Sequence, residues 1–349
     1  MILQKIEYNG FRNLVDNRLE FSDQLNLIIG PNGAGKTNLL EAIFFSAYTR
    51  SFRTNDERNL LKFNEPSLRI QAKSDKTEAN IFYNGEKRLT LGGVEKNRLS
   101  EFIGWLAVCI FSLDDVWILR GTPSRRRAFL DWLISKLNPN YLVNLSEYRR
   151  ILRQRNCLLQ MDQTDIDIEL LNVINEQMIH YGNEIYKERG KIIPVLKEKF
   201  VGVGQALGLN GLDMEYRDST FKMQLDLELL KEREPEDIKY KITGIGPHRD
   251  DILIIRNRRP IKDFGSDGEV RLSAIALKIA ESEILQEKLG GKPILLLDEA
   301  ASELDQKRKE ALFDMLSGQI FYATVNEDNC TKKMVKKRFF IQGGQVEVS

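Results

Sequence analysis

The sequence predicts an α/β fold with a mixed sheet that is split into two halves by an inserted α-helical domain. Three observations predict this class. Residues 25–48 pass from an apolar strand through a glycine-rich turn into an amphipathic helix. Residues 123–234 are mostly helical in pattern. The fully apolar run Ile294–Leu297 is typical of a central parallel strand covered on both faces.

In the first half, alternating or continuous apolar runs predict strands, and one apolar stripe predicts a helix. Strands are expected at 2–8, 19–21 and 25–29, and a helix at 37–48. Three further runs at 68–72, 79–83 and 88–91 are separated by turn signals such as Asn84-Gly85 and Gly92-Gly93, which predicts an antiparallel meander. A buried strand is expected at 105–111. We place the end of this half at residue 118.

The insertion is expected at 119–237, with a kink or stop at Pro194 and a glycine-rich break at 201–211. The second half, 238–349, alternates again between strands and helices. Strands are expected at 251–256, 294–297 and 319–324, and helices at 269–288 and 305–316. The two halves would then form one domain, because the motifs described below lie on both sides of the insertion.

Composition excludes several classes of protein. The 349 residues hold 52 Lys and Arg against 51 Asp and Glu, so the chain is not a polycation that binds nucleic acid indiscriminately. The longest apolar run, 105–111, is far below the roughly 20 residues that span a bilayer. The first residues do not resemble a signal peptide, so we expect a cytoplasmic protein without membrane association. Three isolated cysteines and two histidines predict neither a disulfide framework nor a structural zinc site.

A phosphate-binding loop follows the strand at 25–29. The segment Gly30-Pro31-Asn32-Gly33-Ala34-Gly35-Lys36-Thr37 matches the pattern G-x-x-x-x-G-K-[ST] completely. In this pattern glycines let backbone N–H groups surround the phosphates, the lysine reaches the β- and γ-phosphates, and the threonine hydroxyl binds Mg²⁺. Asn38 extends the expected contact surface. The pattern predicts ATP and Mg²⁺ as cofactors.

A carboxylate pair follows the apolar strand at 294–297. Asp298 stands where a Walker B aspartate holds Mg²⁺ through water, and Glu299 is placed to act as general base toward an attacking water. A strand that ends in the acidic start of a helix is the structural alternative. We expect Lys36 and Glu299 to be the catalytic residues.

The segment Ser266-Asp267-Gly268-Glu269 precedes the long helix and has two compatible interpretations. One is a capping box, in which Ser266 caps the helix and Glu269 reaches back. The other is an ABC-type signature, which presents a hydroxyl, N–H groups and a helix dipole to the γ-phosphate on another subunit. Asp305, in Ala300-Ala301-Ser302-Glu303-Leu304-Asp305, matches the D-loop of such composite sites.

With these motifs the chain resembles the bacterial RecF recombination-mediator family, relatives of the ATPase heads of SMC proteins. The matching segments span nearly the whole chain: 9–13, the phosphate-binding loop with 38–43, 50–54, 125–131, 154–159, 246–251 and 302–305. Three features depart from the family. Glu269 replaces the usual glutamine, Asp298-Glu299 replaces a frequent Asp-Asp, and Ser112-Leu113-Asp114-Asp115 occupies the region where a Q-loop glutamine is expected.

The resemblance implies a fold like an ABC or SMC ATPase head and an ATP-switched DNA clamp. Two copies would enclose two ATP molecules and bind double-stranded DNA or its junction with a gap. Together with RecO and RecR, the dimer would promote loading of RecA. Slow hydrolysis, from a weak ATPase activity that DNA stimulates, would then release the DNA.

The charge distribution supports DNA binding independently. Residues 118–159 hold nine Lys and Arg against two acidic residues, and residues 331–349 hold five against one. The candidate DNA contacts are Arg125, Arg126, Arg127, Arg149, Arg150, Arg153 and Arg155. Each basic run could equally be a solvated helix face or be paired with acidic residues elsewhere. His248 is interpreted as a satisfied loop histidine and Arg53 as a structural arginine.

Two other functions stay open. Within the same fold, the chain could be an SMC-like head of another DNA-maintenance complex, although the long heptad arms of such heads are missing from the sequence. A monomeric P-loop ATPase or kinase is the alternative from another class. It would have no use for Ser266-Asp267-Gly268, and its catalysis would not depend on protein concentration.

Overall fold

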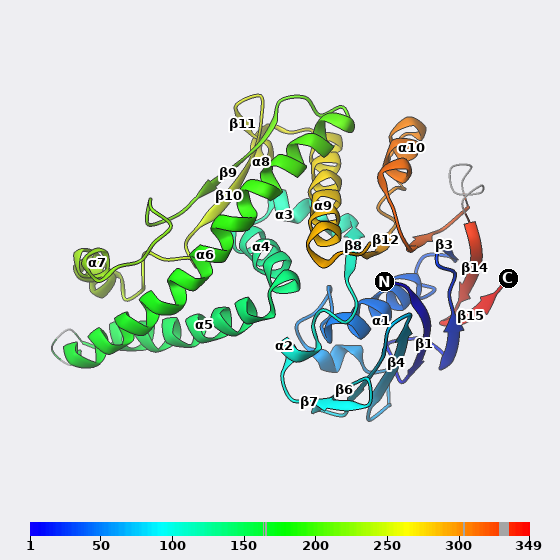
Figure 1. Cartoon of the computed structure of the whole chain (residues 1–349), viewed down its shortest axis with the longest axis horizontal. Helices are drawn as coiled ribbons and strands as arrows, with labels where there is room; N and C mark the ends of the chain where they lie inside the picture. Colours follow the sequence, from blue (N-terminus) through cyan, green and yellow to red (C-terminus); the bar gives the residue numbers. More distant parts are fainter. Residues whose placement is uncertain (163, 165, 303, 328–334) are drawn as a thin grey trace. The chain divides into compact units, whose positions relative to one another are not determined.

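The computed structural model describes residues 1–349 except 163, 165, 303 and 328–334 (Figure 1). It divides into two compact units. Unit 1 combines Met1–Asp115 with Ile275–Ser349, and unit 2 is Val116–Ala274. Among the described residues, no helix is both long and apolar enough to cross a membrane.

A largely parallel sheet forms the centre of unit 1. Its strand order is β15-β14-β3-β13-β12-β8, and only β15 runs antiparallel to its neighbour. The strands are β3 (Leu25–Ile29), β8 (Val108–Ser112), β12 (Ile294–Asp298), β13 (Ile320–Thr324), β14 (Val335–Gln342) and β15 (Gln345–Val348). The predicted central position of the run 294–297 is confirmed, since β12 lies between β13 and β8 and is buried on both faces.

A second, antiparallel sheet in unit 1 has the order β2-β1-β4-β5-β6-β7. Its strands are β1 (Leu3–Asn9), β2 (Asn17–Glu20), β4 (Leu68–Ser74), β5 (Glu78–Tyr83), β6 (Lys87–Leu91) and β7 (Val94–Lys96). In β4 and β5 buried positions alternate with more exposed ones, as expected of strands with one face on the core. The predicted meander is confirmed.

Helix α1 (Lys36–Tyr48) connects the two sheets of unit 1. It contacts β8, β12 and β13 of the parallel sheet, and also β4 and β5 of the antiparallel one. This double contact explains why almost the whole helix is buried, including Glu41 and Ser46. Unit 1 also contains the 3₁₀ turns η1 (Glu57–Leu60) and η2 (Leu113–Asp115), α2 (Leu99–Phe102) and α10 (Gln306–Met315).

Unit 2 is mainly helical. Its helices are α3 (Val116–Arg120), α4 (Pro123–Leu137), α5 (Pro139–Leu159), α6 (Ile168–Ala206), α7 (Leu227–Tyr240) and α8 (Ile261–Phe264), and the boundary between the units falls within α9 (Asp267–Leu289). Helices α5 and α6 run side by side (Figure 1). Pro194 does not stop α6, which packs buried residues on both sides of it, Ile192 and Leu196, so tertiary contacts override the local penalty.

A small antiparallel sheet completes unit 2, in the order β11-β10-β9. Its strands are β9 (Leu212–Arg217), β10 (Asp251–Arg256) and β11 (Arg259–Pro260). Because β10 pairs with β9, residues up to Ala274 belong to unit 2. The sequence predicts the end of the insertion at residue 237 instead. It gives no signal for β9, and without this partner β10 resembles the first strand of the returning main sheet.

Candidate functional site

The phosphate-binding loop joins β3 to α1 at the edge where the parallel strands of unit 1 end. Pro31, Asn32 and Gly33 are exposed at its rim. Gly33 and Gly35 have φ values of 79° and 117°, a region that side chains disfavour. Helix α1 begins without a side-chain cap, so its first N–H groups are open to an anion.

Lys36 is almost completely buried and bends back over the loop. Its Nζ donates to the carbonyl oxygens of Gly30 at 2.9 Å and Pro31 at 3.2 Å, and it lies 3.2 Å from Glu299 Oε1. A buried ammonium needs such partners, because it has lost its water. The contacts hold Lys36 at the centre of the loop, where a phosphate would exchange for them.

Thr37 and Asp298 meet across the site. The Thr37 hydroxyl lies 2.9 Å from both carboxylate oxygens of Asp298. Burial raises the pKa of Asp298, the Thr37 hydrogen bond opposes this, and neighbouring Glu299 raises it further. The charges of Arg53 and Lys36 lower it again. The site therefore places a largely buried carboxylate beside a second carboxylate and a hydroxyl, and these are oxygen groups that a divalent cation can bind.

Glu299 follows directly on β12 in a left-handed backbone conformation, with φ of 53°. Its N–H donates to Ala323 O at 3.1 Å, and its carbonyl accepts from both the backbone N–H and the hydroxyl of Ser302. These bonds fix a backbone that is uncommon for a residue other than glycine. The side chain is thereby held on Lys36. The structure thus brings Lys36, Thr37, Asp298 and Glu299 together, as the sequence predicts.

A polar cluster supports the first turns of α1. Glu41 is fully buried and accepts from Arg12 through Nε at 2.9 Å and Nη2 at 2.8 Å. Arg53 contacts Glu41 at 3.5 Å and Asn38 Oδ1 at 2.8 Å, and Asn38 in turn donates to Asn13. These contacts are those of a structural arginine. Arg53 also lowers the pKa of Asp298, so its charge reaches the site.

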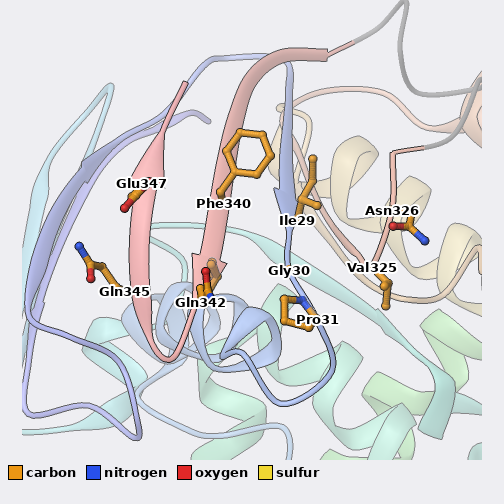
Figure 2. A pocket seen from close by; sticks show the side chains of 10 residues that line it. Ile29, Gly30, Pro31, Val325, Asn326, Phe340, Gln342, Gln345 and Glu347 are labelled. Atoms are coloured by element: carbon orange, nitrogen blue, oxygen red, sulfur yellow. The ribbon is translucent and has the colours of Figure 1, made fainter.

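A pocket of ≈ 500 Å³ adjoins the loop and was not expected from the sequence. Figure 2 shows Phe340 and Gln342 on β14 beside Ile29 and Pro31 at the end of β3. One wall of the pocket is the hairpin of β14 and β15. From the sequence this segment is described only by its basic charge, and no hairpin is predicted there. Gly343-Gly344 between alternating apolar residues is a hairpin signal that could have identified it.

The segment Ser266-Asp267-Gly268 belongs to unit 2, where it lies exposed at the start of α9. The predicted capping box is present. Ser266 N donates to Glu269 Oε2 at 2.9 Å, and Glu269 N lies 3.4 Å from Ser266 Oγ. Glu269 also pairs with Arg256. A glutamine could make the cap but not the ion pair, which gives Glu269 a local structural role.

The remaining loop residues take structural roles. Asp305 caps α10 by accepting from Arg308 N at 2.9 Å, while Glu303 lies outside the described residues. Asp115, in the region of the missing Q-loop, accepts from Ser112 N, and burial raises its pKa to about 6. His248 accepts from the Tyr148 hydroxyl and donates to Thr243 O, as a satisfied loop histidine would.

Two of the seven candidate DNA-binding arginines are buried, and this corrects the sequence prediction. Arg126 pairs through two nitrogens with Asp251, at 2.7 and 3.0 Å. Arg155 pairs with Asp237 at 2.6 Å and has no exposed surface. Neither guanidinium can reach DNA from the interior. The other five, Arg125, Arg127, Arg149, Arg150 and Arg153, are exposed or half-buried. Lys332 and Lys333 of the C-terminal basic run lie outside the described residues.

Replacing Arg155 by alanine is expected to lower the free energy of unfolding by about 3–5 kcal/mol, because it leaves the carboxylate of Asp237 buried without its partner. Arg153→Ala removes an exposed arginine from the same helix and is expected to change the free energy of unfolding by about 0.5 kcal/mol at most. Urea denaturation measures both variants. Equal small effects would contradict the buried ion pair.

Sequence comparison finds relatives over nearly the whole chain. The profile of an AAA domain matches residues 5–313. A DNA replication and repair protein RecF from Lachnoclostridium phytofermentans is 35% identical over 327 residues, covering 91% of both chains. Another from Bacillus cytotoxicus is 34% identical over 356 residues, covering 97% of this chain and 95% of its own.

Solved structures give the same picture. The recombination mediator protein RecF-ATP, described as part of the RecFOR pathway, superposes with a TM-score of 0.90 at 33% identity, covering 100% of this chain and 97% of its own. An SMC head domain from Pyrococcus furiosus superposes with a TM-score of 0.57 at 17% identity over 100% of this chain and 96% of its own. The second likeness concerns the fold alone, and it confirms the predicted ABC/SMC-head architecture.

Proposed function

The chain belongs to the RecF family of DNA replication and repair proteins and carries an AAA domain, and from this membership we propose that it is an ATP-switched DNA-binding protein of recombinational repair. The observation that carries the proposal is the convergence of Lys36, Thr37, Asp298 and Glu299 on one phosphate-binding loop. These side chains come from opposite ends of the chain, and the parallel sheet joins them.

The residues present fit ATP with Mg²⁺. The glycine-rich loop and the uncapped start of α1 would hold the phosphates, and Lys36 would exchange its two carbonyl contacts for phosphate oxygens. Thr37 and Asp298 would hold Mg²⁺, directly and through water. No group of three or more His, Cys, Asp or Glu side chains forms a metal site among the described residues. One carboxylate with a hydroxyl suits Mg²⁺, which normally shares its ligands between protein, phosphate and water.

Glu299 would orient and deprotonate the attacking water. In the present structure its carboxylate lies against the ammonium of Lys36, so it is released for this role only when Lys36 turns to phosphate. The same side chain would thus be neutralised by Lys36 without nucleotide and active with it. We propose weak ATPase activity, stimulated by DNA, that acts as a switch.

Dimerisation would complete the site. Ser266, Asp267 and Gly268 are exposed, and a Cβ atom placed at Gly268 would meet no heavy atom within 4 Å beyond its chain neighbours and the backbone of its own helix. This helix start is open to the phosphates held by a second copy, with Asp305 beside the composite site. The capping box does not compete, since it uses only the N–H groups of Ser266 and Glu269.

DNA binding would use the accessible arginines of unit 2, namely the exposed Arg125, Arg149, Arg150 and Arg153 and the half-buried Arg127. Five arginines supply the local charge density that phosphate binding needs, in a chain of net charge +1. We propose double-stranded DNA and gap junctions as ligands, RecO and RecR as partners, and loading of RecA in the cytoplasm as the outcome. Closure of the dimer would bring two sets of arginines onto one DNA.

Light scattering tests the switch directly. We expect a monomeric mass without nucleotide and a dimeric mass with ATP and Mg²⁺, with DNA favouring the dimer further. Ser266→Arg should leave ATP binding intact and abolish the ATP-dependent dimer, because it places a bulky cation at the composite site. A monomeric mass under all conditions would favour a P-loop enzyme that works alone.

A further inference from the structure

Helices α4, α5 and α6 pack against one another in unit 2 (Figure 1), and a pocket of ≈ 250 Å³ opens between them. Its polar lining comes from Ser124, Arg127, Asp131, Arg149, Arg189 and His248, which together we call the arginine pocket. It belongs wholly to unit 2, which does not contain the phosphate-binding loop.

Two aspartates neutralise most of the positive charge there. Asp131 accepts from Arg189 at 2.8 Å and from Arg149 at 3.3 Å. Asp250, which is fully buried, pairs with Arg189 at 2.9 Å. The third carboxylate nearby, Asp251, is paired with Arg126. The three arginines of the pocket therefore share two carboxylates, and one positive charge has no ion-pair partner among the described residues.

The unmatched charge belongs to Arg127. Its Nη1 donates to the backbone carbonyl of Asp250 at 2.7 Å, and it makes no ion pair among the described residues. Burial lowers the pKa of Arg127 most, and the charge of Arg189 lowers it further, while the more weakly coupled charges of Asp251, Asp131 and Asp250 oppose the shift without reversing it. Burial lowers the pKa of His248 to about 3, against the hydrogen bond to Thr243, and nearby arginine charges, including that of Arg127, act in the same direction as burial. A half-buried cation without a counterion is costly, and an anion in the pocket would relieve that cost.

We propose that the arginine pocket binds one phosphate group. Arginine presents paired N–H donors that match the oxygens of phosphate, and Arg127 and Arg149 stand on neighbouring helices of the same pocket. The pocket is smaller than the roughly 300–1,000 Å³ of sites for whole small molecules, so it suits a phosphate rather than a complete nucleotide. The group comes from the DNA backbone or from a small free phosphate. A phosphate from the DNA backbone rests on the proposed function. Binding of a phosphate group in the pocket does not depend on that function.

Matched arginines on α5 test the site. Arg149 lines the pocket, whereas its neighbour Arg150 faces elsewhere and pairs with Glu147. Both are exposed, so R149Q and R150Q should fold alike. The K36A background prevents the phosphate-binding loop from contributing. Titration calorimetry with inorganic phosphate, at constant ionic strength, should show saturable binding that R149Q weakens about tenfold or more and R150Q leaves unchanged. R127Q should also weaken the binding of inorganic phosphate.

Absence of saturable binding in K36A, or equal affinities in R149Q and R150Q, would overturn the proposal. The source is decided with Lys36 intact and ATP present. If R149Q lowers duplex affinity and its salt dependence relative to the unmodified protein, the phosphate belongs to DNA. If R149Q binds duplex as tightly as the unmodified protein, while inorganic phosphate binding still separates R149Q from R150Q, the pocket takes a free phosphate. Failure of ATP-dependent dimerisation would refute the proposed switch and leave the calorimetric result standing.

Discussion

The Lys36→Ala variant is expected to lose measurable ATP binding, with affinity reduced about a hundredfold or more. Lys36 is the cation at the centre of the phosphate-binding loop, and charge-assisted hydrogen bonds contribute about 1.5–3 kcal/mol each. Its loss removes at least two such bonds to phosphate oxygens. Equilibrium binding of a fluorescent ATP analogue measures the change.

The variant also removes the present partners of the Gly30 and Pro31 carbonyls and of Glu299, so its folding must be checked separately. Lys76→Ala is a suitable control, because Lys76 is exposed in the turn between β4 and β5. It should bind ATP like the unmodified protein. If Lys36→Ala folds and binds ATP with unchanged affinity, the loop is not the nucleotide site.

Local sequence signals predict which residues lie together around the phosphate-binding loop. The loop, the strand before Asp298 and the capping box at Ser266 each depend on residues close together in the chain, where spacing determines geometry. That Lys36 and Asp298 meet follows from a rule of parallel sheets, since strands β3 and β12 end at the same edge.

The arginines of unit 2 show where sequence reasoning fails. Arg153 is exposed and Arg155 buried, although both lie in one basic stretch of α5. The partner of Arg155, Asp237, is 82 residues away, and that of Arg126, Asp251, is 125 residues away. A charge pattern cannot reveal pairs at such separations. The arginine pocket is not predictable from the sequence for the same reason, because its residues come from three helices and a loop that are far apart in the chain.

The Lys36–Glu299 contact links the two halves of the proposed catalytic cycle. It gives both charged groups an ion-pair partner without nucleotide, beside the buried carboxylate of Asp298. Binding of ATP with Mg²⁺ would supply new partners to Lys36 and Asp298 together. Glu299 would lose its contact with Lys36 in the exchange, so nucleotide binding itself would activate the base.

Glu299→Gln should therefore separate binding from hydrolysis. Glutamine keeps the size of the side chain and can still accept a hydrogen bond from Lys36, but it cannot accept a proton from water at neutral pH. Hydrolysis should slow by about a hundredfold or more, the usual contribution of a general base, while ATP affinity stays within a few fold. Phosphate release in single turnover measures the first quantity, and equilibrium ATP binding measures the second.

In the proposed cycle hydrolysis follows dimer closure, so the same variant should accumulate the ATP-bound dimer. Light scattering with ATP and Mg²⁺ should show a dimer that persists for many times the lifetime of the unmodified one, and DNA should dissociate from it correspondingly slowly. Glu310→Gln makes the same chemical change at an exposed position of α10. It should alter neither the rate of ATP hydrolysis nor the mass measured by light scattering. Unchanged hydrolysis in Glu299→Gln would assign the base to another residue. Slowed hydrolysis without a longer-lived dimer would break the proposed link between ATP turnover and release of DNA.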